Sequence, residues 1–206
     1  MSEIFYISDT HFGSKGMIEF DKRPFSSVKE MEEKMIYKWN KKVDKTDEVY
    51  ILGDFSNYKD ESKTINILNR LNGSKTLIKG NHDYITQNIS LCYSEIKDYK
   101  VIKDKKRIVH LSHFPMPFFY HDEVGDSYML FGHLHNSSEN KMIENFRKEI
   151  LSVGSDEFYK GQPYILSSHN KCQFCNVGCM LPYIDYTPQT LDEIINKFKI
   201  FQGKIK

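Results

Sequence analysis

The stretch TLIKGNHDYI, residues 76–85, decides the fold, because in it a short apolar strand runs directly into three polar side chains. Residues 76–79 have the composition of a strand. They are followed by Gly80 and then by Asn81, His82 and Asp83 in a row. An amide, an imidazole and a carboxylate side by side suit neither a packed core nor an ordinary surface turn. Their meaning therefore depends on how the other strands of the chain end.

The first half of the chain alternates strands with amphipathic helices. Apolar runs predict strands at 3–9, 47–54 and 75–81. Apolar residues at helical spacing predict helices at 26–43 and 61–73. A strand–helix–strand order predicts a parallel sheet with right-handed crossovers.

The second half has a different pattern. Residues 95–113 predict two strands joined by a tight turn near Asp104, and 127–135 and 170–180 predict two more strands. Helices are expected at 137–151 and 187–201, the latter with Thr187 as N-cap and Pro188 in the first turn. We therefore expect one α/β domain over residues 1–206, with parallel pairing early and antiparallel pairing late.

Composition excludes several classes of protein. Lysine and arginine total 29 against 28 acidic residues, so the net charge of +1 suggests neither strong nucleic-acid binding nor attraction to an anionic membrane. The chain has no run of about 18 apolar residues that could span a membrane. Its first residues lack the basic and apolar regions of a secretory signal. We expect a cytoplasmic protein.

The cysteines allow two interpretations. His169, Cys172, Cys175 and Cys179 lie close together in the sequence and could hold zinc. A structural zinc site usually combines two ligand pairs that are well separated in sequence, which is not the case here. We favour a buried strand that uses cysteine as a small apolar residue. The sequence leaves the zinc alternative open.

Five predicted strands end in residues that bind metals. These residues are Asp9 and His11 after the first strand, Asp54 after the second, Asn81 after the third, and His113, His133 and His135 after the later strands. In α/β sheets the carboxyl ends of the strands meet at one crevice. The tripeptide in 81–83 is therefore expected to be part of a shared site.

The donor set is too large for one tetrahedral metal. Two carboxylates, one amide oxygen and four imidazoles suit two cations of five or six coordination, with water completing each shell. Asp54 has two oxygens and could bridge them at the separation of about 3.5–4 Å that is usual in two-metal hydrolytic sites. The imidazoles favour Mn, Fe, Co, Ni or Zn over Mg or Ca. Glycines at 53, 80 and 132 would allow close approach of the backbone.

Other polar and aromatic residues could act on a substrate. His82 is not needed as a ligand and could protonate a leaving alkoxide or stabilise charge on a transferring phosphoryl group. Asp83 could hold the His82 ring or cap a helix. Lys22 and Arg23 could face the mouth of the crevice, or belong to a solvated loop. Phe118 could stack on a base, although packing is the commoner role of such aromatic residues.

The ordered set of strand ends resembles the calcineurin-like metallophosphoesterases. The blocks that carry the resemblance are DTH (9–11), GD (53–54), GNHD (80–83), SH (112–113) and GHLH (132–135). The loop at 12–31 is similar to that of a small bacterial and phage branch of this family. The second block reads GDFSNYKD and lacks the arginine of the protein serine/threonine phosphatases, so we do not expect a protein phosphatase.

The resemblance implies a four-layer α/β/β/α sandwich with mixed sheets. It implies that Asp9, His11, Asp54 and His135 hold one metal and that Asp54, Asn81, His113 and His133 hold the other. It makes His82 the acid or the residue that stabilises the transition state, and a metal-bound hydroxide the nucleophile.

We expect a dinuclear metallophosphoesterase, with manganese first among the candidate metals. Its substrate would be a small-molecule phosphodiester such as a nucleotide or cyclic nucleotide. The alternatives are a phosphomonoesterase, a metal-binding scaffold without turnover, and a nucleic-acid binder, which the near-neutral charge disfavours.

Overall fold

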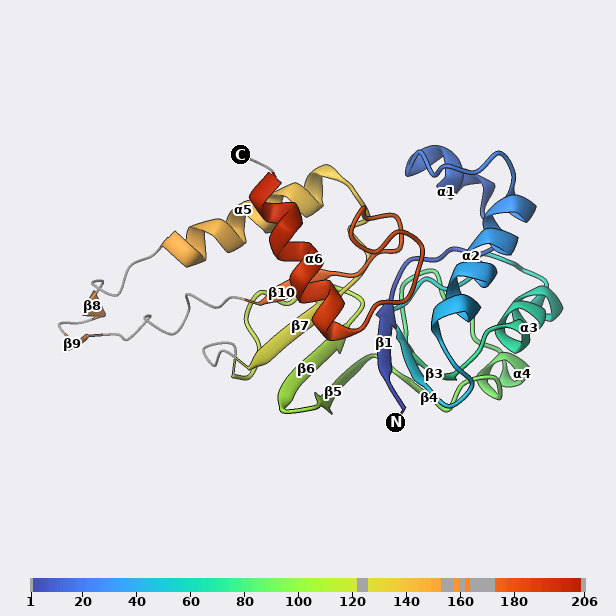
Figure 1. Cartoon of the computed structure of the whole chain (residues 1–206), viewed down its shortest axis with the longest axis horizontal. Helices are drawn as coiled ribbons and strands as arrows, with labels where there is room; N and C mark the ends of the chain where they lie inside the picture. The colour runs from blue at the N-terminus through green and yellow to red at the C-terminus, as the bar shows by residue number, and fades with distance from the viewer. Residues whose placement is uncertain (1, 122–125, 153–157, 160–161, 164–172, 205–206) are drawn as a thin grey trace.

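Two four-stranded sheets form the centre of the computed structural model, which describes residues 2–121, 126–152, 158–159, 162–163 and 173–204 (Figure 1). The first sheet has the order β1-β2-β3-β4, and all neighbouring strands are parallel. Its strands are β1 (Ile4–Ile7), β2 (Glu48–Ile51), β3 (Ser74–Ile78) and β4 (Glu95–Lys97). The predicted parallel crossovers of the first half are confirmed.

The second sheet is mixed and has the order β10-β7-β6-β5. Its strands are β5 (Tyr99–Asp104), β6 (Arg107–Ser112), β7 (Ser127–Phe131) and β10 (Phe174–Asn176). Only β5 and β6 are antiparallel, because a tight turn joins them, whereas β7 is parallel to both of its neighbours. A separate short pair joins β8 (Phe158–Tyr159) to β9 (Gln162–Pro163). The expectation of antiparallel pairing late in the chain is therefore correct for the β5–β6 hairpin and for the separate β8–β9 pair, but not for the rest of the second sheet.

The segment 95–113 contains three strands instead of the two predicted. Residues Glu95–Lys97 pair with β3 in the first sheet, and the chain then passes into the second sheet at Tyr99. The change of sheet takes place at Asp98, within one residue. The sequence shows no break there, because both strands are short and similarly polar.

Helices cover the outer faces of both sheets (Figure 1). On the side of the first sheet lie α1 (Lys15–Phe20), α2 (Val28–Lys42), α3 (Glu61–Arg70) and α4 (Gln87–Ser90). On the side of the second sheet lie α5 (Ser138–Ser152) and α6 (Leu191–Lys204). This arrangement is the expected α/β/β/α sandwich. No helix in the described part of the chain is both long enough and apolar enough to cross a membrane.

The core joins the two sheets. Ile7 and Ile51 of the first sheet belong to the same buried apolar cluster as Val109, Leu111 and Leu130 of the second. Removing these side chains from water is the main force that holds the sheets face to face. The ends of their strands are thereby fixed relative to one another.

Backbone hydrogen bonds tie the two sheets together at the end of β1. The Ser8 N–H donates to the Val177 carbonyl at 3.0 Å, and the Cys179 N–H donates to the Ser8 carbonyl at 2.9 Å. The Val177 N–H in turn donates to the carbonyl of Phe131, the last residue of β7, at 2.8 Å. The polar strand ends of the two sheets therefore meet at one seam.

The last helix begins later than predicted. It starts at Leu191 and is capped by Thr190, whose hydroxyl accepts from the Glu193 N–H at 3.4 Å and whose N–H donates to the Glu193 carboxylate at 2.9 Å. The expected start at Thr187 and Pro188 is wrong. Gln189 exchanges two backbone hydrogen bonds with Tyr6, so the chain stays extended up to this point.

Candidate metal centre

The seven predicted donors come together at the seam between the sheets. Asp9, His11 and His135 form one group and Asp54, His113 and His133 form another, and within each group the ligand atoms all lie within 4.8 Å of one another. The Asn81 side-chain oxygen joins the second group, at 3.0 Å from His113 Nε2.

The two groups meet at Asp54. One of its oxygens, Oδ2, lies 3.6 Å from His11 Nε2 in the first group and 3.5 Å from His113 Nε2 in the second. A carboxylate in this position can share its oxygens between two cations. The family resemblance implied the same grouping and the same bridging residue.

Five of the donors have a left-handed backbone. The φ angles are 55° at Asp9, 47° at His11, 54° at Asp54, 66° at His133 and 49° at His135. Non-glycine residues seldom adopt this conformation, and such residues concentrate at functional sites. Each one turns sharply at the end of its strand, so its side chain lies over the seam instead of continuing the alternation of the strand.

Glycines leave room for the carboxylates, as predicted. A Cβ atom at Gly80 would lie 2.3 Å from Asp54 Oδ1. A Cβ atom at Gly132 would lie 1.9 Å from Ser8 Oγ and 2.6 Å from Asp9 Oδ2. Both carboxylates therefore lie directly against the backbone of a neighbouring strand end.

Alanine at Gly132 should destabilise the protein and displace Asp9. Because the added methyl group would overlap Ser8 and Asp9, we expect a loss of about 1–3 kcal/mol in the free energy of unfolding, measured by urea denaturation. Gly16→Ala is the matched control, since its Cβ atom would approach nothing closer than 3.9 Å. Equal stability of the two variants would contradict the close packing at Gly132.

Three imidazoles are oriented by partners on their outer nitrogen. Nδ1 of His135 lies 2.9 Å from an Asp21 carboxylate oxygen, and Nδ1 of His113 lies 2.8 Å from the Leu52 carbonyl. Both partners can only accept, so Nδ1 carries the proton. Nδ1 of His11 lies 2.6 Å from the Asn57 side-chain oxygen, in the same arrangement.

The Nε2 atoms, on the opposite side of these rings, therefore carry lone pairs that point toward other acceptors. Nε2 of His11 lies 3.3 Å from Nε2 of His135, and Nε2 of His113 lies 3.0 Å from the Asn81 oxygen. Two acceptors at this distance repel each other unless a cation or a proton lies between them. Imidazoles whose outer N–H groups are held by acceptors are typical of metal ligands. The residues present therefore fit divalent cations.

Burial and neighbouring groups set the protonation states of two of the donors, His11 and Asp54. Burial lowers the pKa of His11 to about 4, which keeps its ring neutral. Burial alone would raise the pKa of Asp54, but the hydrogen bond and positive charge of His113 in its protonated form, together with the His82 N–H, outweigh burial and lower the pKa to about 2. A neutral imidazole and an ionised carboxylate are the forms that bind metals.

Arg23 has a different position from the one expected. Its side chain is buried, pairs with Asp21 at 2.8 Å, and donates to the backbone carbonyls of Asp9 at 3.0 Å and Thr10 at 2.8 Å. It therefore stabilises the turn that carries Asp9 and His11 from inside. The interpretation that Arg23 faces the mouth of the crevice is wrong.

The other two predicted substrate contacts are exposed side chains. Lys22 is exposed, at the turn after α1. Phe118 is also exposed, and its ring meets the ring of Phe146 on α5 at 5.9 Å.

His82 and Asp83 have separate roles in the structure. The His82 N–H donates to Asp54 Oδ1 at 2.8 Å, and its exposed ring lies 5.6 Å from the ring of His11. The Asp83 carboxylate accepts from the backbone N–H groups of Asp54, Phe55 and Gly80, each at 2.8 Å. Asp83 therefore fixes the backbone that carries Asp54.

The cysteine cluster is described only in part. His169 and Cys172 lie outside the described residues. Cys175 and Cys179 are buried in the apolar core, as the strand interpretation predicted. Among the described residues, neither cysteine belongs to a metal-binding group.

The three groups that hold the rings, Asp21, Asn57 and the Leu52 carbonyl, were not predicted from the sequence. Asp21 lies at the C-terminal end of α1, a helix that was not predicted because it has six residues and no buried face. Every residue has a backbone carbonyl, so a sequence does not show which carbonyl accepts a hydrogen bond from a histidine. Of the three, only Asn57 could have been suspected from the sequence, because it lies in the second block, GDFSNYKD.

Removing the Asp21 carboxylate should weaken metal binding. We expect Asp21→Ala to lower the metal affinity about 10- to 100-fold, because His135 would lose the acceptor that orients its ring. A metal titration by calorimetry would measure the loss. Glu19→Ala, on the exposed side of the same helix, is the matched control. Wild-type affinity in the Asp21 variant would disprove this role.

Comparison with known proteins agrees with the architecture. A sequence model of the family described as calcineurin-like phosphoesterase matches residues 3–179. The uncharacterized protein MJ1445 of Methanocaldococcus jannaschii is 44% identical over 84 residues, which are 40% of this chain and 48% of that protein. The chain thus matches about half the length of this curated relative.

Two solved structures are similar. The protein of unknown function AQ665 from Aquifex aeolicus has a TM-score of 0.59 and 22% identity, covering 95% of this chain and 99% of that one. The nuclease MPE from Pseudomonas putida has a TM-score of 0.42 and 20% identity, covering 64% and 61%. The similarity to AQ665 shows a shared fold. The match over residues 3–179 shows more: this chain belongs to the calcineurin-like phosphoesterase family, whose members are hydrolases that act on phosphoric esters.

Proposed function

We propose that this protein is a dinuclear metal-dependent phosphoesterase that hydrolyses a phosphodiester. The observation that carries the proposal is the meeting of two donor groups at Asp54, which lies within 3.6 Å of an inner imidazole nitrogen from each group. Family membership supports the reaction class. The neutral ring of His11 and the ionised carboxylate of Asp54 support binding of two divalent transition metals, with Mn the first candidate and Fe, Co, Ni or Zn the others.

Different residues of the chain would bind the metals, donate the proton and position the ligands. Two bound cations would supply Lewis-acid polarisation of the phosphoryl group and would lower the pKa of bound water. The ligands would be Asp9, His11, Asp54, Asn81, His113, His133 and His135. His82, which is exposed beside them, would protonate the leaving oxygen or stabilise charge on the phosphoryl group. Asp83 would act as a positioning residue, because its carboxylate is fully engaged with backbone N–H groups.

A proton donor next to the donor groups suits a phosphoester with an alkoxide leaving group, and within that class we propose a diester. An alkoxide is a poor leaving group and benefits from protonation as the bond to phosphorus breaks. The phosphomonoester of a small molecule is the alternative substrate. A scaffold without turnover is disfavoured, because all seven donors and His82 are present together.

Hydrolysis by metal-stripped protein, with and without added Mn²⁺, tests this proposal. The substrates are a chromogenic phosphodiester and the matching monoester. We expect Mn²⁺-dependent turnover that favours the diester. Preference for the monoester would make the protein a phosphatase. No turnover on either substrate with two metals bound would overturn the proposed activity.

Other expectations about the whole protein stay predictions. They are a cytoplasmic location, one domain over residues 1–206, a small-molecule substrate and no strong affinity for nucleic acid. A steep, salt-dependent affinity for DNA or RNA would contradict the last of these.

A further inference from the structure

A groove lies beside the candidate metal centre, on the side of His82. It is lined by Ser56, Asn57, Tyr58, Lys59, His82 and Tyr84. These residues come from the loops that follow β2 and β3, which also carry Asp54 and Asn81. The groove adjoins the metal centre at two points, because Asn57 holds His11 and the ring of His82 lies 5.6 Å from the same histidine.

One wall of the groove is fixed. The Tyr58 hydroxyl donates to a Glu32 carboxylate oxygen at 2.8 Å. One side of its ring lies so close to Gly13 that a Cβ atom there would be 2.8 Å from three ring carbons. Lys63 Nζ lies 5.1 Å from the ring centroid. These contacts hold the Tyr58 ring in one orientation before any ligand arrives.

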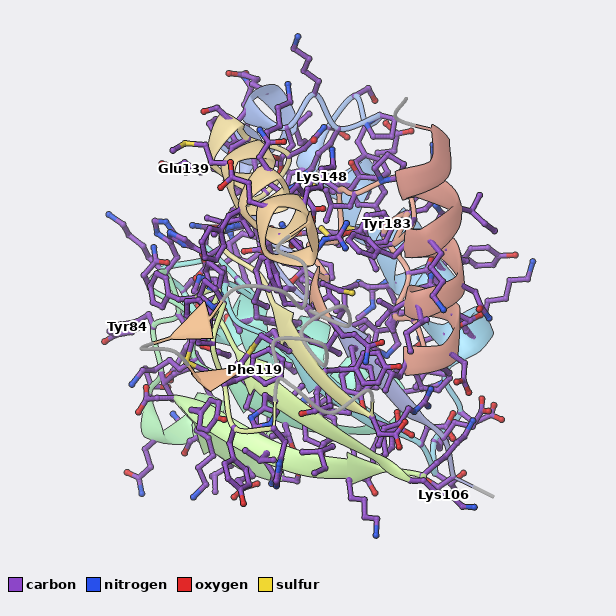
Figure 2. All side chains as sticks on the ribbon, turned by 90° about the vertical axis from the view of Figure 1, so that its left-hand side faces the viewer. Tyr84, Lys106, Phe119, Glu139, Lys148 and Tyr183 are labelled. Carbon is purple, nitrogen blue, oxygen red and sulfur yellow. The ribbon has the colours of Figure 1, made fainter. Side chains whose placement is uncertain are left out.

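The other wall is free to meet a ligand. Tyr84 is 67% exposed, and its side chain projects from the edge of the molecule (Figure 2). A large exposed aromatic side chain next to a reactive centre gains contact area when a planar group covers it. Lys59, also exposed, adds a positive charge to the same groove.

We propose that this groove binds the leaving group of the substrate, and that the leaving group is a nucleoside. The inference rests on the proposed function. His82 is the proposed proton donor and lines the groove, so the oxygen that it protonates belongs to the group bound there. The base stacks on Tyr84, with the fixed Tyr58 ring as the opposite wall of the groove and the Lys59 charge beside it.

The reaction that follows is balanced. Water adds its oxygen to phosphorus while the bond from phosphorus to the nucleoside oxygen breaks. That oxygen takes a proton from His82, and the water's proton restores His82. The products are a phosphomonoester and a free nucleoside.

Binding of free adenosine tests the groove without turnover. Calorimetry with metal-loaded protein should show adenosine binding that Tyr84→Ala weakens about tenfold, the range expected for one base stacked on one aromatic ring. Tyr37→Ala is the matched control, because Tyr37 is 66% exposed on α2, outside the groove. Absence of adenosine binding, or equal loss in both variants, would overturn the proposal. Binding of p-nitrophenol without adenosine would assign an aryl leaving group instead and overturn the nucleoside.

Turnover tests the leaving-group role. One substrate is a dinucleoside monophosphate from which adenosine leaves, and the other is the matching methyl ester. We expect Tyr84→Ala to lower the ratio of kcat/KM for the two esters about tenfold, mainly through the KM of the adenosine ester. An unchanged ratio would overturn the inference while leaving the proposed function intact. Adenosine binding without hydrolysis of any ester would instead overturn the proposed function and, with it, the leaving-group role.

Discussion

Alanine at position 54 should remove both metal ions together. In the proposed site, Asp54 is the ligand shared by the two donor groups, with Oδ2 at 3.6 Å from His11 Nε2 and 3.5 Å from His113 Nε2. Each remaining group would lose a carboxylate, and the second would keep only neutral donors. We expect the metal content to fall from two ions to less than one per chain. Turnover should fall at least about 10³-fold, since the cations supply several kcal/mol of stabilisation to the transition state.

Elemental analysis after desalting measures the metal content, and circular dichroism shows whether the variant folds. His135→Ala and His133→Ala are the matched controls, because each ring belongs to one group only. Each control should lose about one equivalent of metal. Loss of a single equivalent from the Asp54 variant would disprove the bridging position.

The sequence was sufficient to predict that the candidate donors lie close together. The carboxyl ends of parallel strands meet at one edge of a sheet, so polar residues at the end of each strand had to come together. The second sheet was included in this prediction because β6 and β7 also lead into histidines, His113 directly after β6 and His133 two residues after β7. Strand periodicity and the positions of strand ends are local properties, and a sequence displays them directly.

The sequence was not sufficient to predict how the donors are held. The left-handed backbone at Asp9 and His11 is accompanied by hydrogen bonds from their N–H groups to the carbonyls of Gly53 and Asp54, and it does not follow from residue type, since both residues usually adopt other conformations. Asp21 reaches His135 across 114 residues of sequence, in a helix too short to show a period. Such contacts depend on the packed structure and leave no local pattern.

Arg23 illustrates the same limit. An exposed loop with basic residues next to a phosphate site suggests substrate contact, and composition alone offers no way to distinguish the alternatives. In the structure, the guanidinium group of Arg23 pairs with Asp21 and donates hydrogen bonds to two backbone carbonyls. A buried arginine must be paired in this way, because leaving its charge unpaired in the core would be very unfavourable. Burial, which the sequence does not give for a single loop residue, decides its role.

Alanine at position 82 should abolish most turnover while leaving both metals bound. The His82 ring is exposed and belongs to neither donor group, and only its backbone N–H contacts Asp54, at 2.8 Å. Alanine keeps that N–H, so the ligand should stay in place. We expect kcat to fall about 10²- to 10⁴-fold, the usual contribution of a general acid. The loss should be larger for an alkyl ester than for a p-nitrophenyl ester, because p-nitrophenolate leaves readily without a proton.

His121→Ala is the matched control, since His121 is a histidine outside both donor groups, on the loop that follows β6. It should keep the wild-type rate and metal content. Steady-state kinetics on the two esters, combined with elemental analysis, separates the outcomes. A near-wild-type rate for the His82 variant would exclude His82 as the proton donor. Loss of metal from that variant would make His82 a ligand, because only its imidazole has been removed.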